Sequence, residues 1–374
     1  MKKIFQLISS VQLGGAEIIA FCLSEHSDQI LSQPAEISVI ELYRSKNSYA
    51  DQKRKELAQK TVPVITLHNG SKRVSLLISP IKLCLLILKE KPSIIHSHTD
   101  LPDFVLAVAL KMLSLFSVKK PEVIRTIHST QLWRTHHTFG RISESAYQDE
   151  PVAAVSSYAM TAYEQLRKKY NLPISQNRQI IYNGCKFPSQ NPHSFHIDTQ
   201  KINIAFCGRF EDYKGMDTLL EIIPEISLLY PGDFLFHLIG DGTYKKQLQQ
   251  LALQQDNVIL YEPVPNVSTM FHAFDFLFMP SHFEGLTLIS IEASFAGVPV
   301  IASFAPGLDE TLPENWPLKF HLDRKDELLA IFRNIKDQLY NLKKIREMAF
   351  DFVSKKFSMN EMIQSYHQLY TEIL

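Results

Sequence analysis

The stretch Ile202-Asn203-Ile204-Ala205-Phe206-Cys207-Gly208-Arg209 joins an apolar run to a glycine and a basic residue. Residues 202–207 have the length and apolar content of a buried strand, and the apolar spacing of residues 216–229 predicts a helix behind it. The same order of strand and helix recurs on both sides of this stretch. Such alternation is typical of parallel, doubly wound sheets. The sequence therefore predicts an α/β fold.

Two series of short apolar runs predict two sheets. The expected strands of the first series are residues 3–8, 37–42, 64–67, 94–96, 123–127 and 152–155, and those of the second are residues 202–207, 234–239, 258–260, 276–279 and 299–302. Residues 184–200, which include Pro188 and Pro192, have little apolar periodicity and indicate a linker. We therefore expect two Rossmann-like domains, residues 1–190 and 200–356, that face each other across a cleft.

The composition narrows the classes of function. The chain has 374 residues, of which 45% are hydrophobic, and a formal net charge of +0. This balanced charge gives no electrostatic case for binding nucleic acid. The four scattered cysteines indicate thiols in a reducing compartment rather than a disulfide framework. Because no run of about 18 uninterrupted apolar residues occurs, we expect a cytoplasmic protein without a membrane span.

A loop with two cations, Arg209 and Lys214, follows the strand at residues 202–207. Arginine offers a rigid fork of donors and lysine a mobile point charge, and both suit the phosphates of a nucleotide diphosphate. Gly208 and Gly215 would let the backbone approach a phosphate closely. The alternative is an ordinary strand-to-helix turn with surface charges.

Two carboxylates, Glu284 and Glu292, bracket a glycine and an apolar stretch that predicts a largely buried helix. We place the start of that helix at residues 285–287 and Glu292 two turns within it, so that the helix dipole favours anions nearby. Carboxylates accept hydrogen bonds from vicinal hydroxyls, as on ribose or a hexose. With the two cations they predict a nucleotide-sugar site. Two solvated glutamates on a surface helix are the alternative.

Nearly the whole chain resembles the retaining glycosyltransferases of family 4, which have the glycosyltransferase B (GT-B) fold. No single motif is specific, and the resemblance depends on the order and spacing of several. These are Gly14-Gly15-Ala16-Glu17, Ile94-Ile95-His96-Ser97-His98, Asn183-Gly184, Gly208-Arg209, Lys214-Gly215, Gly240-Asp241-Gly242, Pro280-Ser281, Glu284 to Glu292 and Gly297-Val298-Pro299-Val300.

The resemblance implies a role for each candidate residue. Arg209 and Lys214 would hold the donor diphosphate. Glu292 would bind the ribose hydroxyls, and Glu284 would lie against the transferred sugar as a catalytic residue. Residues 357–374 resemble the segment that packs back onto the N-terminal, acceptor-side domain. The remaining donor-binding positions, and the histidines that are candidates for a catalytic contact with the sugar, are Gly14, Gly15, Gly285, Leu286, Thr287, His98 and His128.

Several histidines raise the alternative of a metal site, namely His96, His98, His128, His136 and His137. A zinc site needs three or four converging ligands. No carboxylate partner is evident for the His96 and His98 pair, and the pattern Asp-x-Asp occurs nowhere in the chain. We therefore expect no metal ion and no cofactor besides the nucleotide-sugar substrate.

Residues 71–91 and 112–120 combine leucine and isoleucine with flanking lysines and arginine. Stretches of this kind can lie on an anionic membrane surface. We prefer to interpret residues 71–91 as a core helix with solvated basic ends. Peripheral association with the inner face of a membrane is the alternative, and it would suit a membrane-bound acceptor.

The sequence thus predicts a hexosyltransferase that moves a sugar, with retention, from a nucleotide diphosphate sugar to a glycan or lipid-linked acceptor in surface polysaccharide biosynthesis. Same-face attack would explain the retention, and a covalent intermediate on Glu284 is the rival mechanism. Three alternatives are an epimerase of the same fold, a dinucleotide-dependent oxidoreductase and a catalytically silent binding protein. The oxidoreductase is disfavoured because Gly-x-Gly-x-x-Gly does not follow the first strand. The sequence predicts no oligomeric state.

Overall fold

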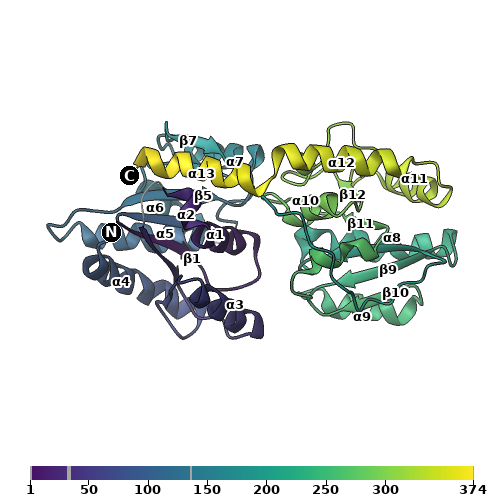
Figure 1. Ribbon diagram of the computed structural model, residues 1–374, viewed down its shortest axis with the longest axis horizontal. Helices are drawn as coiled ribbons and strands as arrows, with labels where there is room; N and C mark the ends of the chain where they lie inside the picture. The colour runs from purple at the N-terminus through teal and green to yellow at the C-terminus, as the bar shows by residue number, and fades with distance from the viewer. Residues whose placement is uncertain (1, 32–34, 135–136, 374) are drawn as a thin grey trace. The chain divides into compact units, whose positions relative to one another are not determined.

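The computed structural model describes residues 2–31, 35–134 and 137–373. The chain divides into two compact units. Unit 1 comprises Met1–Gly184 together with Met359–Leu374, and unit 2 comprises Cys185–Ser358. The last helix, α13 (Met359–Ile373), therefore belongs to unit 1, where Figure 1 shows it in yellow among purple and blue elements. Among the helices of the described residues, none is long and apolar enough to cross a membrane.

Unit 1 contains a sheet of seven parallel strands in the order β3-β2-β1-β4-β5-β6-β7. The strands are β1 (Lys2–Ile8), β2 (Ala35–Glu41), β3 (Val64–Thr66), β4 (Ile94–His98), β5 (Glu122–Ile127), β6 (Val152–Ala154) and β7 (Arg178–Ile180). Its helices besides α13 are α1 (Gly15–Glu25), α2 (Ser27–Ile30), α3 (Ser48–Gln59), α4 (Lys72–Glu90), α5 (Asp100–Leu113), α6 (His137–Ser145) and α7 (Ser157–Lys169).

Unit 2 contains a sheet of six parallel strands in the order β10-β9-β8-β11-β12-β13. The strands are β8 (Ile202–Cys207), β9 (Phe234–Ile239), β10 (Val258–Tyr261), β11 (Phe276–Met279), β12 (Val300–Ser303) and β13 (Lys319–Phe320). Its helices are η1 (Asp212–Lys214), α8 (Met216–Leu229), α9 (Lys245–Gln254), η2 (Val267–Ala273), α10 (Leu288–Phe295), η3 (Asp309–Thr311), α11 (Lys325–Lys336) and α12 (Leu342–Lys356). The predicted pair of doubly wound α/β domains is confirmed.

Each sheet reverses its strand order beside its first strand, because β1 lies between β2 and β4 and β8 lies between β9 and β11. Open α/β sheets bind ligands at such switch points, beyond the carboxyl ends of the strands. The residues that follow β8 and β11 in unit 2, and β1, β4 and β5 in unit 1, are therefore the places to look for a site.

The sheet of unit 1 is covered on both faces, and α13 forms part of one cover. Neighbouring residues of β1 enter different cores, since Ile4 packs with α13 and Phe5 packs on the face of α4 and α5. This alternation is the ordinary pleat of a strand. From α13 the buried side chains are Met362, Ile363, Tyr366, Leu369 and Tyr370.

Helix α4 is buried on one side only, which differs from the core helix that we preferred from the sequence. Residues such as Leu83 and Ile87 face the core, whereas Leu77 is 77% exposed. The exposed apolar side chains recur every three or four residues and so form one stripe along the helix. We call this stripe, Val74, Leu77, Ile81 and Leu85, the α4 stripe.

A cluster of buried charges joins β5 to the helices around it. Arg125 donates from Nε and Nη2 to Oδ2 of Asp103 at 2.9 and 2.8 Å, and from Nη2 to Oε1 of Glu144 at 2.6 Å. Arg167 also meets Glu144 and donates to the carbonyl of Tyr147 at 2.8 Å. Burial alone would raise the pKa of Glu144, but the two arginines lower it below its ordinary value. The charges are therefore compensated within the core.

Candidate functional site

The loop after β8 is held against the segment that follows β11. Gly215 has a left-handed φ of 76°, and a Cβ atom there would lie only 1.9 Å from the carbonyl oxygen of Pro280. A residue with a side chain would be excluded at this position, both by its backbone conformation and by this contact. The N–H of His282 donates to the carbonyl of Tyr213 at 2.8 Å. The loop that carries Lys214 and the loop that carries Glu284 are thus fixed to each other.

Lys214 and Glu284 meet directly in this pair of loops. Nζ of Lys214 lies 2.6 Å from Oε1 of Glu284, and the Ser281 hydroxyl donates to the same oxygen at 2.8 Å. The Lys214 side chain is 16% exposed and that of Glu284 is 9% exposed. A lysine in this setting is a charged donor at the edge of solvent rather than a freely solvated surface group. The interpretation of both residues as independent surface charges is thus excluded.

Aromatic rings link Arg209 to the same place. The guanidinium carbon of Arg209 lies 5.6 Å from the ring centroid of Tyr213, and Nζ of Lys214 lies 5.8 Å from it. The ring of Tyr213 stacks on that of Phe283, with centroids 5.1 Å apart. Cations over a ring face are attracted to it. Sequence reasoning missed both aromatic residues, although each is a direct neighbour in sequence of a predicted site residue.

The helix after Glu284 begins later than predicted. Gly285, Leu286 and Thr287 are not helical, and α10 starts at Leu288 with Thr287 as its N-cap in an extended conformation. Glu292 therefore lies about one turn inside α10, not two. The delay has a packing reason, because the N–H of Glu284 donates to the carbonyl of Pro306 at 2.8 Å. This bond holds the chain at Glu284 against the neighbouring loop, and the helix starts only after Thr287.

Glu292 lies on α10, half-buried, near the end of β8. Burial raises its pKa to about 7, and a hydrogen bond with the Ser268 side chain acts in the opposite direction. The pKa of the Cys207 thiol is raised mainly by burial and, to a smaller extent, by the negative charge of Glu292. Cys207 is the last residue of β8, two residues before Arg209. All four predicted residues thus lie in segments that follow the carboxyl ends of two neighbouring strands, β8 and β11.

In unit 1, Gly14 and Gly15 follow β1 at the start of α1. Gly14 is the N-cap in an extended conformation, and Gly15 is the first helical residue, with no atom within 4 Å of the place where a Cβ would lie. The free N–H groups of a helix start are available to an anion at such a position. The role of this loop towards a donor phosphate stays a prediction.

The two candidate histidines of unit 1 contact each other. Nδ1 of His98, the last residue of β4, lies 3.0 Å from Nε2 of His128, which follows β5. Burial lowers the pKa of His98 well below its ordinary value and that of His128 to about 3, so both rings are neutral at physiological pH. Thr99, directly after His98, has a φ of 75° and a ψ of 168°. Strained backbone of this kind in a residue other than glycine is concentrated at functional sites.

The histidines do not form a metal site within the described residues. No group of three or more His, Cys, Asp or Glu side chains in that part of the chain could hold a metal ion. His137 begins α6, and His136 lies outside the described residues. The expectation of a metal-independent activity stays a prediction, and an assay in EDTA tests it.

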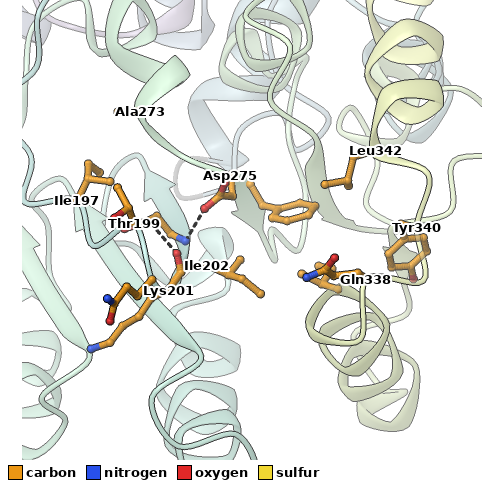
Figure 2. A pocket seen from close by; sticks show the side chains of 13 residues that line it. Ile197, Thr199, Lys201, Ile202, Ala273, Asp275, Gln338, Tyr340 and Leu342 are labelled. Atoms are coloured by element: carbon orange, nitrogen blue, oxygen red, sulfur yellow. Dashed lines mark hydrogen bonds between the residues drawn. The ribbon is translucent and has the colours of Figure 1, made fainter.

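A cavity lies elsewhere in unit 2 (Figure 2). It has a volume of about 630 Å³ and opens at the amino end of β8, around Ile202 and Asn203. Asp275 lines it and accepts a hydrogen bond from the N–H of Asn203 at 2.8 Å. Since Arg209 follows the opposite end of β8, this cavity is separate from the site of Lys214 and Glu284. The rule for parallel sheets points to the carboxyl end of β8 instead.

Comparison with known proteins finds one family match and several relatives. Residues 201–336 match the model of the family described as Glycosyl transferases group 1. An uncharacterised 41.2 kDa protein in the cps region of Klebsiella pneumoniae is 28% identical over 84% of this chain and 87% of its own length. An uncharacterised glycosyltransferase of Methanocaldococcus jannaschii is 25% identical over 87% of this chain and 88% of its own.

Solved structures resemble the chain over its full length. Anabaena HepE in complex with UDP-glucose has a TM-score of 0.78 at 17% identity, and the match covers 100% of both chains. At this identity the likeness shows the fold alone, and it confirms the GT-B fold. The support for a glycosyltransferase comes from the family match over residues 201–336.

Proposed function

We propose that this GT-B glycosyltransferase moves a hexose from a nucleotide diphosphate sugar to a hydroxyl of a glycan or lipid-linked acceptor, with retention. The observation that carries the proposal is the cluster of Lys214, Glu284 and Arg209 at the carboxyl end of β8. Two relatives add to it, because one is a protein in a cps region and HepE was solved with UDP-glucose. Surface polysaccharide biosynthesis, from the cytoplasmic side, is the setting that we propose.

In the proposed reaction the bond between the anomeric carbon and the diphosphate oxygen breaks, and the diphosphate leaves with the electron pair. The acceptor oxygen attacks from the same face, and its proton passes to the departing diphosphate. Lys214 and Arg209 stabilise the negative charge that develops on the leaving group, which is the kind of preorganised contact that catalysis uses most. His98 and His128 would contact the transferred sugar.

Glu284 is better suited to orient than to attack in this scheme. Its Oε1 already accepts hydrogen bonds from Lys214 and Ser281. A carboxylate oxygen that is bound by an ammonium and a hydroxyl is a weaker nucleophile than an unbound one. We therefore propose that Glu284 holds Lys214 in place and accepts from sugar hydroxyls, and that same-face attack occurs without a covalent intermediate.

Retention is tested by the configuration of the product. The expected result is that an α-linked donor gives an α-linked product, read from the coupling constant of the anomeric proton by NMR at early times. A β-linked product would refute the retaining mechanism and leave the transferase activity standing. Release of free sugar without any acceptor product would contradict the transferase activity itself.

The raised pKa of Glu292 predicts a pH-dependent donor affinity. Its pKa of about 7 exceeds the ordinary carboxyl value, so the free protein carries a protonated Glu292 below that pH. Ribose hydroxyls donate to the ionised form, and binding at low pH must therefore release a proton. The affinity should rise roughly thirtyfold between about pH 5.5 and 8, as the ionised fraction does. Titration calorimetry of a nucleotide diphosphate sugar at several pH values measures this change.

The matched variant for this titration is Glu292→Gln, which keeps the shape and cannot ionise. Its donor affinity should be weaker at pH 8 and flat across the range. The same shift predicts that the stability of the ligand-free protein falls as the pH rises from the ordinary carboxyl range through 7, because the folded state binds the extra proton. A wild-type affinity that does not change with pH would refute the role of Glu292.

We also propose that the α4 stripe lies on an anionic membrane surface, where a lipid-linked acceptor would be found. Leu77 and Leu85 are 77% and 59% exposed, and residues 72–89 contain no Asp or Glu. The exposed cations on this helix are Lys72, Arg73, Lys82 and Lys89. An exposed apolar stripe bordered by cations is the pattern of a helix that lies in the interface of an anionic bilayer.

Vesicle flotation tests this surface. The double variant Leu77→Ser/Leu85→Ser should bind vesicles containing phosphatidylglycerol at least about tenfold more weakly than the wild type. The reason is that two leucines that the bilayer would bury are lost. Leu253→Ser is the matched control, since Leu253 is 86% exposed on α9 of unit 2. Equal binding to vesicles of phosphatidylcholine alone, or no loss in the double variant, would contradict the proposal.

A further inference from the structure

A chain of buried hydrogen bonds runs from α13 to the histidine pair, His98 and His128. The hydroxyl of Tyr370 on α13 accepts from Nε2 of Gln6 at 2.8 Å. Oε1 of Gln6, which lies on β1, is 2.8 Å from Nε2 of His98. Nδ1 of His98 in turn lies 3.0 Å from Nε2 of His128. Gln6, His98 and Tyr370 are each no more than 1% exposed.

The order of donors along this chain fixes the protons on the histidine pair. An amide oxygen can only accept, so Nε2 of His98 must carry the proton that is donated to Gln6. Because the His98 ring is neutral, its Nδ1 is an acceptor, and Nε2 of His128 must donate to it. His128 is also neutral, and its other nitrogen, Nδ1, is therefore unprotonated.

The Tyr370 hydroxyl is the partner of the amide NH2 group of Gln6. The phenol also lies 2.7 Å from Nδ1 of His96, whose Nε2 is 2.6 Å from Oγ1 of Thr126. With its proton directed to His96, the Tyr370 oxygen offers a lone pair to the amide NH2 group. That contact holds the amide oxygen towards His98. Without it the amide can rotate by 180° and present its NH2 group to His98. The proton of His98 would then move from Nε2 to Nδ1, and that of His128 likewise.

We propose that Tyr370 is a positioning residue that acts through Gln6 on the histidine pair and keeps Nδ1 of His128 as a hydrogen-bond acceptor for a substrate hydroxyl. The part that concerns substrate depends on the proposed function, because it takes His128 to contact the transferred sugar. The part that concerns protons does not, since it holds in the substrate-free protein. A residue near the C-terminus thereby sets the chemistry at the carboxyl end of the sheet of unit 1.

The first arm of the test is a long-range 1H–15N spectrum of the substrate-free protein, which distinguishes the two tautomers of a neutral histidine. In the wild type, His98 and His128 should both carry the proton on Nε2. In Tyr370→Phe, which keeps the ring and removes the hydroxyl, a population of His128 with the proton on Nδ1 should appear. A wild-type His128 with its proton on Nδ1, or a variant spectrum identical to that of the wild type, would overturn the proposal.

The second arm measures kcat/KM of the same variants. Tyr370→Phe should lose about tenfold, the value of one hydrogen bond to the substrate. The matched control is Tyr366→Phe on the same helix, because the Tyr366 hydroxyl meets the chain 3.2 Å from Oγ1 of Thr126, beyond His96. The control should stay within about twofold and keep the wild-type tautomers, since one neutral contact away from substrate is lost.

The two arms separate this inference from the proposed function. If no nucleotide sugar supports transfer by the wild type, the proposed function fails while the spectra still decide the proton order. If the wild type is active and His128→Ala lowers its activity, but Tyr370→Phe changes neither spectrum nor rate, the inference alone fails. Equal losses in Tyr370→Phe and Tyr366→Phe, without a change of tautomer, would show a merely structural role and would also overturn it.

Discussion

Replacement of Lys214 by methionine should lower kcat/KM by about two to three orders of magnitude, the usual loss for one preorganised contact to developing charge. Methionine keeps most of the side-chain volume and removes the ammonium. Two effects add, because the leaving diphosphate loses a cation and Glu284 loses the partner 2.6 Å from its Oε1. A carboxylate that has lost its ammonium partner in this position would repel the donor. Steady-state rates with a nucleotide diphosphate sugar measure the loss.

Lys325→Met is the control for this prediction. Lys325 lies on α11 of the same unit and pairs with Glu221 at 2.8 Å, where both side chains are exposed. Its removal should change kcat/KM by less than about twofold, because exposed ion pairs contribute little. If Lys214→Met behaves like this control, the cluster at the end of β8 is not the catalytic site.

Replacement of Glu144 by alanine should lower the free energy of unfolding of unit 1 by about 3–5 kcal/mol, the cost of breaking a buried ion pair by removing one partner. Glu144 is 1% exposed and compensates both Arg125 and Arg167, which are equally buried. Without it Arg125 would keep Asp103 as an ion-pair partner, whereas Arg167 would be left with carbonyl acceptors such as those of Pro173 and Tyr147, in a medium that solvates its charge poorly. Urea denaturation, followed by a probe in unit 1, measures the change.

Glu164→Ala is the matched control for stability. Glu164 pairs with Arg178 at 2.7 Å, but the two side chains are 28% and 33% exposed. Its loss should cost no more than about 1 kcal/mol, as is usual for ion pairs near solvent. Equal effects of the two substitutions would mean that Arg125 finds water or another partner when Glu144 is gone.

The sequence was sufficient for the two sheets because most strands are short but clearly apolar runs. It missed β7 and β13, each of which lies at one of the two edges of its sheet. β7 is Arg178-Gln179-Ile180 and β13 has two residues, so neither carries a recognisable pattern. Such strands are defined by pairing with a neighbour rather than by their own composition. Single-sequence reasoning has no access to that pairing.

The site could be predicted only in part, for a similar reason. Glycines and charged residues at strand ends marked Arg209, Lys214, Glu284 and Glu292, and their chemical types suggested the ligand. The predicted start of α10 was wrong, because a contact with the loop at Pro306 makes the helix begin later in the chain. Which charges pair, and which are buried among each other, depends on contacts between residues far apart in the chain.

The histidine pair and the buried charges illustrate the same limit. Tyr370 meets Gln6 across 364 positions of sequence, and no local pattern relates the two. Arg125 sits within an apolar strand, where its burial was invisible without Asp103 and Glu144 around it. The sequence lists such residues but does not show which of them form hydrogen bonds or ion pairs with each other.

Thermal denaturation in the presence of uridine, guanosine and adenosine diphosphate sugars tests the central claim most directly, because a ligand of the native state raises its stability by RT ln(1 + [L]/Kd). At least one of these donors should raise the melting temperature of the wild type by about 2–4 °C or more at a hundredfold excess over Kd. The double variant Arg209→Met/Lys214→Met should show no such rise. An equal rise in the double variant, or none in the wild type with any donor, would contradict the assignment of these cations to a donor diphosphate.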